Sequence, residues 1–397
     1  MGRSIQIEVW NKSYVRRGYI NSQAVTLPDS QVGFISLHAT VRVGAASDCD
    51  FTIAADHPLV EDLMTAGARC VVTYRYEDGA TPIRLISGRV QTPSGANPSK
   101  QSTRTFAIRD DWSILNSTTG WPSPDAAIGS QASVGYYTKS GPAETVALDL
   151  IKQNYVDSPR LNQPLVLPTS LGRGSNISVQ FRMDYLADKL YPAVINAGVI
   201  VEIGQVGDHR EVTIREPATY GPKLTEGSGV VVNGSFSMDA PTATRVIVGI
   251  AGTDTTPRIF RQFINTAAEA EIGEPLEVFV DASDIALTDD VTAEAQKRAD
   301  EAFADNAAKV SLDITLIEQG AFMYGKAFRE GDNVKIQLYG TPVFTDYVRE
   351  VEVNADADGG IAVSPHVGDW QDDPDSKLFA QVDSMDMMIR SVALRTL

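Results

Sequence analysis

The feature that most constrains the fold of this chain is a strand–turn–strand pattern that occurs in two distant places. In the later copy, Val334, Ile336 and Leu338 alternate with polar residues, which is typical of a β-strand with one buried face. A Gly-Thr-Pro turn at 340–342 follows, and the chain returns through 344–353, which predicts a hairpin. On the return strand, the same alternation predicts a common face for Tyr347, Val351 and Val353.

The earlier copy of the pattern begins after a glycine at position 67. Cys70, Val72, Tyr74 and Tyr76 alternate along its first strand, and a Glu-Asp-Gly turn leads into a return strand that ends near residue 90. Two such units in distant parts of one chain predict an internal duplication of a β-rich unit.

The length and composition of the chain predict several folded domains. With 397 residues and 43% hydrophobic content, the chain is longer than one typical domain and can form real cores. Strand patterns alternate with helical patterns at about 56–67, 141–155, 183–197 and 293–307, which predicts a β-rich α+β protein. The predicted domains are a first β domain at 1–112, a mixed α/β insertion at 113–228, a second β domain made of 229–254 with 308–370, an α/β segment at 255–307 that packs with the insertion, and a helical tail at 371–397.

The net charge of the chain is −17, with a pI of about 4.7. This charge argues against a surface that grips nucleic-acid phosphates. It is compatible with plain solubility, and also with a passage through which a polyanion slides without sticking. The apolar runs are far shorter than the roughly 20 residues that a membrane-spanning helix needs, and the N-terminus lacks the pattern of a signal peptide.

The C-terminal tail carries a regular apolar spacing. The residues on this spacing, separated by steps of 4, 3, 4 and 3, are Leu378, Val382, Met385, Ile389 and Val392. This is the a/d pattern of a coiled-coil seam, which would make these residues a partner-binding surface. Because only two heptads are present, a terminal helix packed on its own domain is an equal alternative.

Two stretches resemble ligand-binding motifs but lack essential parts. Residues 320–326 have the spacing of a phosphate-binding loop, yet Ala327 stands where that motif needs Ser or Thr. Asp356 and Asp358 match the first half of a calcium loop, but Pro365 occupies the position of its bidentate Glu, so a polar hairpin turn is favoured.

No other residue pattern indicates chemistry. The four histidines have no metal-binding spacing, and the two cysteines, Cys49 and Cys70, fit no zinc motif. Cys70 lies in the apolar register of its strand, which predicts a buried thiol. We therefore predict no catalytic, metal-binding or cofactor-binding residues.

The order of these pieces resembles the tail hub proteins of tailed bacteriophages, and more narrowly the minor tail proteins of phages that infect actinobacteria. The stretches that carry the resemblance span about residues 30–370. They are the helix and hairpin at 56–90, Gly-Pro-Ala-Glu-Thr-Val at 141–146, Ala-Pro-Thr-Ala-Thr-Arg-Val at 240–246, Glu-Val-Phe-Val-Asp at 277–281, Gly-Asp-Asn-Val at 331–334 and Val-Arg-Glu-Val-Glu-Val at 348–353.

The resemblance implies a non-enzymatic virion protein at the tail tip, assembled in the host cytoplasm. It implies two related β-barrel-like tube domains with mixed α/β domains inserted. It also implies a homotrimer whose six barrels join a sixfold tail tube or distal tail protein to a threefold spike or fibre. The implied partners include the tape-measure protein and a downstream tail-tip or fibre protein, with DNA only as passing cargo. A C-terminal helical seam would suit a threefold exit.

Two alternatives of other classes stay open at this point. A cell-wall or glycan hydrolase on a β-scaffold would place two carboxylates about 5–10 Å apart in a cleft. A carbohydrate-binding adhesin module would show exposed aromatic side chains on one β-face.

Overall fold

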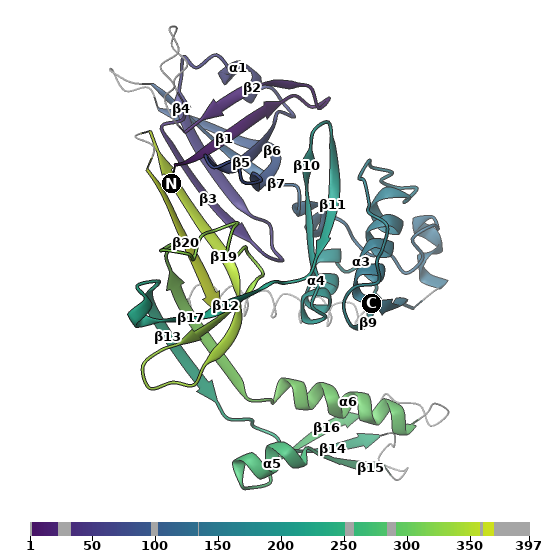
Figure 1. The fold of residues 1–397 in the computed structure, drawn as a ribbon. Coiled ribbons are helices and arrows are strands. Elements are labelled where there is room, and N and C mark those ends of the chain that lie inside the picture. The colour runs from purple at the N-terminus through teal and green to yellow at the C-terminus, as the bar shows by residue number, and fades with distance from the viewer. Residues whose placement is uncertain are drawn as a thin grey trace. The chain divides into compact units, whose positions relative to one another are not determined.

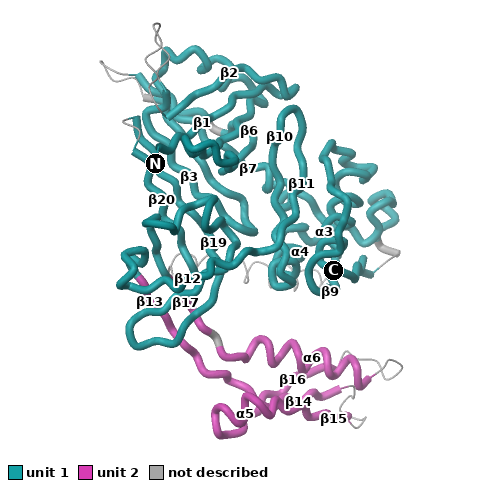
Figure 2. The backbone as a smooth tube through the Cα atoms, viewed as in Figure 1, with its two compact units in different colours: residues 1–233, 314–368 teal, residues 234–313, 369–397 magenta. Residues whose placement is uncertain are grey.

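The computed structural model describes residues 2–22, 33–96, 102–133, 135–250, 258–283, 291–357 and 360–368. The chain forms two compact units, of which unit 1 comprises residues 1–233 and 314–368 and unit 2 comprises residues 234–313 and 369–397 (Figure 2). The predicted C-terminal seam lies outside the described residues, so it stays a prediction.

Unit 1 is built around one large sheet (Figure 1). Its strands follow the order β13 (Val231–Asp239), β17 (Lys309–Leu316), β20 (Ile361–Gly368), β19 (Phe344–Asp356), β3 (Ser36–Arg42), β4 (Asp48–Ala54), β7 (Thr103–Asp110), β6 (Ile83–Ala96), β5 (Arg69–Tyr76), β1 (Arg3–Trp10) and β2 (Arg16–Asn21). Off this path, β18 (Asn333–Gln337) pairs with β19 and with β12 (Thr219–Thr225). Strands β13 and β17 cross the boundary between the units.

The ladder between β3 and β19 joins the N-terminal strands to the C-terminal ones. It is antiparallel and pairs Ser36 with Asp356 at one end and Arg42 with Glu350 at the other. The β-rich character expected from the sequence is confirmed. The described strands form an open path of pairs and no closed barrel.

Both predicted hairpins are present. In the first, β5 and β6 pair from Arg69–Arg89 to Tyr74–Ile83, and Cys70, Val72, Tyr74 and Tyr76 are all buried as expected. In the second, β18 and β19 pair from Asn333–Tyr347 to Ile336–Phe344.

The predicted face of the second return strand is wrong at its first residue. A β-bulge interrupts the pairing of β19 with β20 between Val348 and Glu350. A bulge adds one residue to a strand and so reverses the alternation beyond it. As a result Val348 and Val351 are both fully buried, whereas Tyr347 is only half-buried.

The mixed α/β segment of unit 1 packs around its own core. Its elements are β8 (Tyr137–Pro142), α3 (Ala143–Ile151) with a π-helical turn at Lys152–Val156, β9 (Asn176–Phe181), α4 (Leu186–Asn196), β10 (Ile200–Val206) and β11 (His209–Arg215). Helix α4 buries Leu186, Leu190 and Val194 as predicted. It ends at Asn196, and Gly198 follows with a φ of 79° that suits glycine. The Val199 N–H donates to the carbonyl of Val194.

The remaining helices of unit 1 are short. They are α1 (Val60–Met64), α2 (Ser113–Ser117) and 3-10 helices at Ile128–Ser133 and Glu226–Ser228. Among the described residues, the structure contains no helix with the length and apolarity that crossing a membrane requires.

Unit 2 is a small α/β unit. Strand β14 (Arg245–Ile250) pairs antiparallel with β15 (Ile259–Ile264) and parallel with β16 (Glu277–Ala282). Helix α5 is Thr266–Ile272, and α6 is Val291–Asp305. Helix α6 packs against β14 through Ala295, Ala299 and Ala302, so the predicted helix near 293–307 is confirmed.

Candidate functional site

The candidate site is one continuous polar face of the large sheet. In an antiparallel pair, residues directly opposite each other point to the same side of the sheet. The register therefore places the following residues together, which we call the polar face: Ser36, His38, Thr40, Arg42, Asp48, Asp50, Thr52, Thr105, Arg109, Glu350, Glu352, Asn354, Asp356, Ser364 and His366.

The opposite side of the same strands is apolar. Phe51, Ile53 and Phe106 are fully buried on β4 and β7, and Val351 and Val353 are fully buried on β19. This alternation gives each strand one apolar side in the core and one polar side. Most residues of the polar side are partly or fully exposed, whereas Thr40 and His366 are buried. The polar face is a built surface of the sheet, because the buried side holds these strands in register.

The polar face carries more negative than positive charge. Its carboxylates belong to Asp48, Asp50, Glu350, Glu352 and Asp356, and its arginines are Arg42 and Arg109. Arg42 lies between two of these acids, with its Nε 3.1 Å from the Glu350 carboxylate and its Nη1 2.5 Å from the Asp48 carboxylate.

Hydrogen bonds tie neighbouring strands together across the polar face. The Nδ1 of His38 lies 2.7 Å from the Oδ1 of Asn354, which joins β3 to β19. The hydroxyls of Thr52 and Thr105 lie 2.8 Å apart, which joins β4 to β7. A shallow groove runs between Ser36, His38, Asn354 and Asp356.

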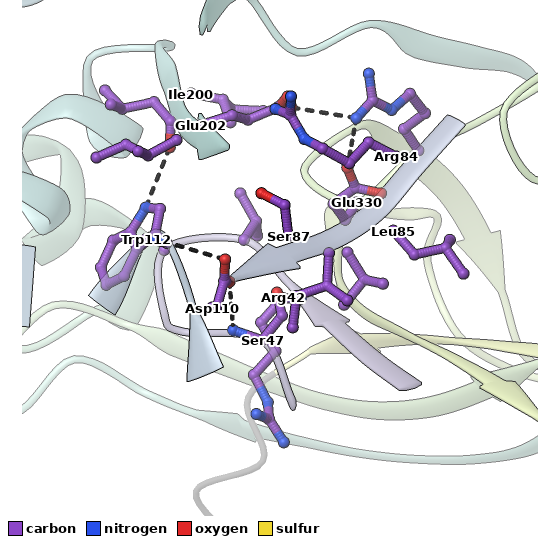
Figure 3. A pocket seen from close by; sticks show the side chains of 17 residues that line it. Arg42, Ser47, Arg84, Leu85, Ser87, Asp110, Trp112, Ile200, Glu202 and Glu330 are labelled. Carbon is purple, nitrogen blue, oxygen red and sulfur yellow. Dashed lines mark hydrogen bonds and ion pairs between the residues drawn. The ribbon is translucent and has the colours of Figure 1, made fainter. Parts of the chain in front are cut away.

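A separate cavity of about 50 Å³ lies inside unit 1 (Figure 3). It is lined by residues of β3, β6 and β10, by Asp110 at the end of β7, and by Ser47, Trp112, Arg329 and Glu330. A space of this size holds only a few water molecules. It is too small for a sugar ring, whereas a glycan hydrolase would need two carboxylates that face a bound sugar.

The carboxylates of this cavity are held by fixed donors. Asp110 accepts hydrogen bonds from the backbone N–H groups of Ser47 and Trp112 at 2.8 and 3.1 Å, and burial raises its pKa to about 6. Burial opposes ionisation of Glu202, but Arg329 and Arg215 nevertheless lower the pKa of that carboxyl. These contacts hold Asp110 and Glu202 in the walls of the cavity.

A second buried ionic group anchors the insertion to the sheet. Asp111 accepts hydrogen bonds from Arg69 at 2.6 and 2.8 Å and from the hydroxyl of Ser87 at 2.8 Å. The Nε of Arg69 also donates to Gln205 on β10 at 2.7 Å. A buried pair of this kind is costly to break, because the remaining charge would be left without a partner.

The motifs discounted from the sequence have structural roles. Lys326, in the stretch that resembles a phosphate loop, forms an ion pair with Asp78 and lies 4.0 Å from the ring centre of Tyr76. Asp356 accepts a hydrogen bond from the Gly360 N–H at 2.9 Å in the turn between β19 and β20, so the predicted hairpin is present. Asp358 lies outside the described residues.

Sequence reasoning missed the polar face. Its signal was present as alternation at 36–42 and 48–54, where Ser, His, Thr, Asp and Arg recur at every second position. Local alternation cannot show that β3 pairs with β19, which lies about 300 residues further along the chain.

Comparison with known proteins decides the family. The model of the siphovirus ReqiPepy6 Gp37-like proteins matches residues 6–369. The chain belongs to this family. It is a structural protein of a phage tail and not an enzyme, and the hydrolase alternative is set aside.

One solved structure with a TM-score above 0.5 supports the fold, and two others have slightly lower scores. The 43 kDa tail protein of prophage MuSo2 from Shewanella oneidensis is 14% identical, with a TM-score of 0.51 over 91% of this chain and 98% of that one. A tail protein from Neisseria meningitidis is 12% identical, with a TM-score of 0.49 over 94% and 98% of the two chains. The prophage tail protein gp18 of Listeria monocytogenes is 11% identical, with a TM-score of 0.49 over 96% and 98%. No curated protein matches the chain in sequence.

Proposed function

We propose that this protein is the hub of the tail tip, a homotrimer whose polar faces line the channel through which DNA leaves the virion. The observation that carries the proposal is the continuous polar face that extends from β7 across β3 and β19 to β20. Its excess of carboxylates would repel DNA phosphates, which lets DNA pass without adhering.

The β3–β19 ladder supports a hub in a second way. It joins strands from both ends of the chain into one sheet, so each subunit could contribute two sets of strands to a ring. Three such subunits would present six sets, which matches a sixfold tail tube or distal tail protein above and a threefold spike or fibre below. We further propose that the two halves correspond to two barrel-like domains that are completed in the assembled ring.

The proposed hub would contact the tape-measure protein within the channel and a downstream tail-tip or fibre protein beyond it. The C-terminal residues Leu378, Val382, Met385, Ile389 and Val392 would form the threefold seam. The domains proposed from the sequence, 1–112, 113–228, 229–254 with 308–370, 255–307 and 371–397, would supply the tube and its surroundings.

The oligomeric state tests this proposal. We would measure the mass of the purified chain by light scattering at several concentrations, beside a variant that ends before Ser376. A trimer that is lost on truncation supports both the hub and the seam. A full-length chain that stays monomeric when mixed with the purified neighbouring tail proteins contradicts the trimeric hub.

A second candidate function is the carbohydrate-binding adhesin module, which one observation supports. In unit 2, Phe260 on β15 and Phe279 on β16 are 58% and 52% exposed, and their ring centres lie 6.5 Å apart. Both rings lie near Gly249 of β14 on the side of the sheet away from α6. Binding of the purified chain to host cell-wall saccharides, lost in Phe260→Ala, would support this function, and equal binding by that variant would count against it.

A further inference from the structure

Three side chains with metal-binding atoms meet at one point of the polar face. Glu350 and Glu352 lie two residues apart on β19, and His366 on β20 is the direct antiparallel partner of Glu350. One donor atom of each lies within 4.8 Å of the donor atoms of the other two. Among the described residues this is the only group of three or more His, Cys, Asp or Glu side chains that meets so closely.

The strand geometry gives these residues the form of a tripod. Residues two apart on a strand project from the same side, and the directly opposed residue of the next strand is only about 5 Å away between Cβ atoms. Two positions on one strand and one on its neighbour therefore aim three donors at a common point. Three protein ligands with a fourth position open to water is a common arrangement for zinc.

We propose that Glu350, Glu352 and His366 bind a divalent first-row transition metal, and that Zn²⁺ is the ion that fits best. One imidazole nitrogen with two carboxylate oxygens suits Zn²⁺ and its neighbours, whereas Ca²⁺ and Mg²⁺ favour sites made of oxygen alone. This inference stands on the geometry of β19 and β20 and does not depend on the trimeric hub.

The surroundings of His366 suit a metal ligand. Its Nδ1 lies 3.4 Å from the hydroxyl of Thr315 on β17, and its Nε2 lies 3.9 Å from the carboxylate of Glu352. In the tautomer that carries its proton on Nδ1, the Nδ1–H donates a hydrogen bond to the hydroxyl of Thr315, and Nε2 is left with a lone pair on the side of Glu352. An outer partner that orients a ligating imidazole in this way is typical of metal sites.

Arg42 is the group that competes with the ion. Its Nε donates to Oε2 of Glu350 at 3.1 Å, so binding has to use the other carboxylate oxygen or displace this contact. Arg42 also pairs with Asp48, which shares its charge between two acids. While Arg42 donates to Oε2, this contact orients the Glu350 carboxylate and leaves Oε1 for the ion.

A bound ion would link β19 to β20 and reduce the negative charge of the polar face. These strands are already joined by backbone hydrogen bonds, so the ion adds to a site that the sheet has formed in advance. The expected effect is a higher thermal stability of the whole chain when Zn²⁺ is present, because the ion binds only the folded state.

The test uses the full-length chain, stripped of metal with a chelator and then equilibrated with Zn²⁺. Bound zinc is counted by mass spectrometry after dialysis, and its affinity is measured by competition with a coloured chelator. We expect one zinc per chain, a raised Tm, and affinity that falls at least about 10-fold in Glu352→Gln and in His366→Gln. Co²⁺ in place of Zn²⁺ should give visible absorption bands that both variants lose.

His209→Gln is the matched control. His209 is a half-exposed histidine on β11 that lies 3.1 Å from Asp208 and 3.8 Å from Glu211. The substitution therefore removes a histidine near two carboxylates elsewhere in unit 1. We expect it to bind zinc as the unchanged chain does, and we expect Mg²⁺ to have no effect on Tm.

Two results would overturn the site. One is that the folded chain without substitutions retains no zinc after dialysis. The other is zinc affinity that stays the same in Glu352→Gln, which indicates binding elsewhere. Circular dichroism without metal shows whether each variant folds. Glu352 is only half-buried, so Glu352→Gln decides the question if His366→Gln does not fold.

Discussion

The two hairpins share a sequence pattern but differ in what covers them. In the β5–β6 hairpin both sides of β5 are covered, since Val71 and Thr73 are buried as well as Val72 and Tyr74. In the β18–β19 hairpin the long strand β19 keeps one side in the core and exposes carboxylates on the other. The comparison shows that the repeated pattern specifies strand pairing, whereas the elements packed on each hairpin decide whether its second face is core or surface.

The largest expected difference between the two regions concerns their ion pairs. In Asp111→Ala, the buried Arg69 beside β5 loses its charge partner, and we expect a loss of about 3–5 kcal/mol in the free energy of unfolding. Asp48→Ala removes an acid of the polar face that is 74% exposed, so the loss should be at most about 1 kcal/mol. Urea unfolding followed by circular dichroism measures both. Equal losses would contradict the distinction between a covered and an open face.

The pH dependence of stability should distinguish a buried carboxyl from an exposed one. Burial raises the pKa of Asp110 to about 6 in the folded chain, above its usual value near 4. The folded state then binds more protons than the unfolded state between about pH 4 and 6, so stability from this group is present at low pH and is lost as the pH rises to 6. The loss is about 3 kcal/mol, since one pKa unit corresponds to about 1.4 kcal/mol.

Asp110→Asn removes this titration, so its unfolding free energy should change less than that of the unchanged chain between pH 4 and 7. Asp50→Asn, on the polar face, serves as the control. Its unfolding free energy should vary with pH as that of the chain without substitutions does. An Asp110→Asn profile that runs parallel to the unchanged one would refute the role of burial at this carboxyl.

The smallest expected effect compares the two sides of one strand. Ile53 of β4 is fully buried, and Ile53→Val should cost about 0.5–1.5 kcal/mol. Its neighbour Thr52 lies on the polar face, and Thr52→Ser keeps the hydroxyl that bonds to Thr105, so its cost should stay within about 0.5 kcal/mol. Thermal unfolding of both variants checks the alternation, and a larger cost for Thr52→Ser would show that this face is covered.

Local patterns predicted much of the secondary structure. Alternation identified both hairpins, and i,i+4 spacing identified α4 and α6, because these signals arise within short segments. The face of Tyr347 was mispredicted, since a bulge depends on the partner strand and not on alternation alone. The β3–β19 ladder was not predicted either, because pairing between distant strands depends on the tertiary fold. The polar face and the Glu350, Glu352 and His366 cluster follow from that ladder and its neighbours, so they became visible only in the structure.

The most direct test of the central claim is a cryo-electron-microscopy reconstruction of the intact tail tip of the phage that encodes this chain. The account predicts three copies around the tail axis, with Asp50, Glu352 and Asn354 of each copy facing the channel. Copies arranged with these residues on the outside of the tip, or buried against another tail protein, would contradict the proposal that the polar face lines the path of DNA.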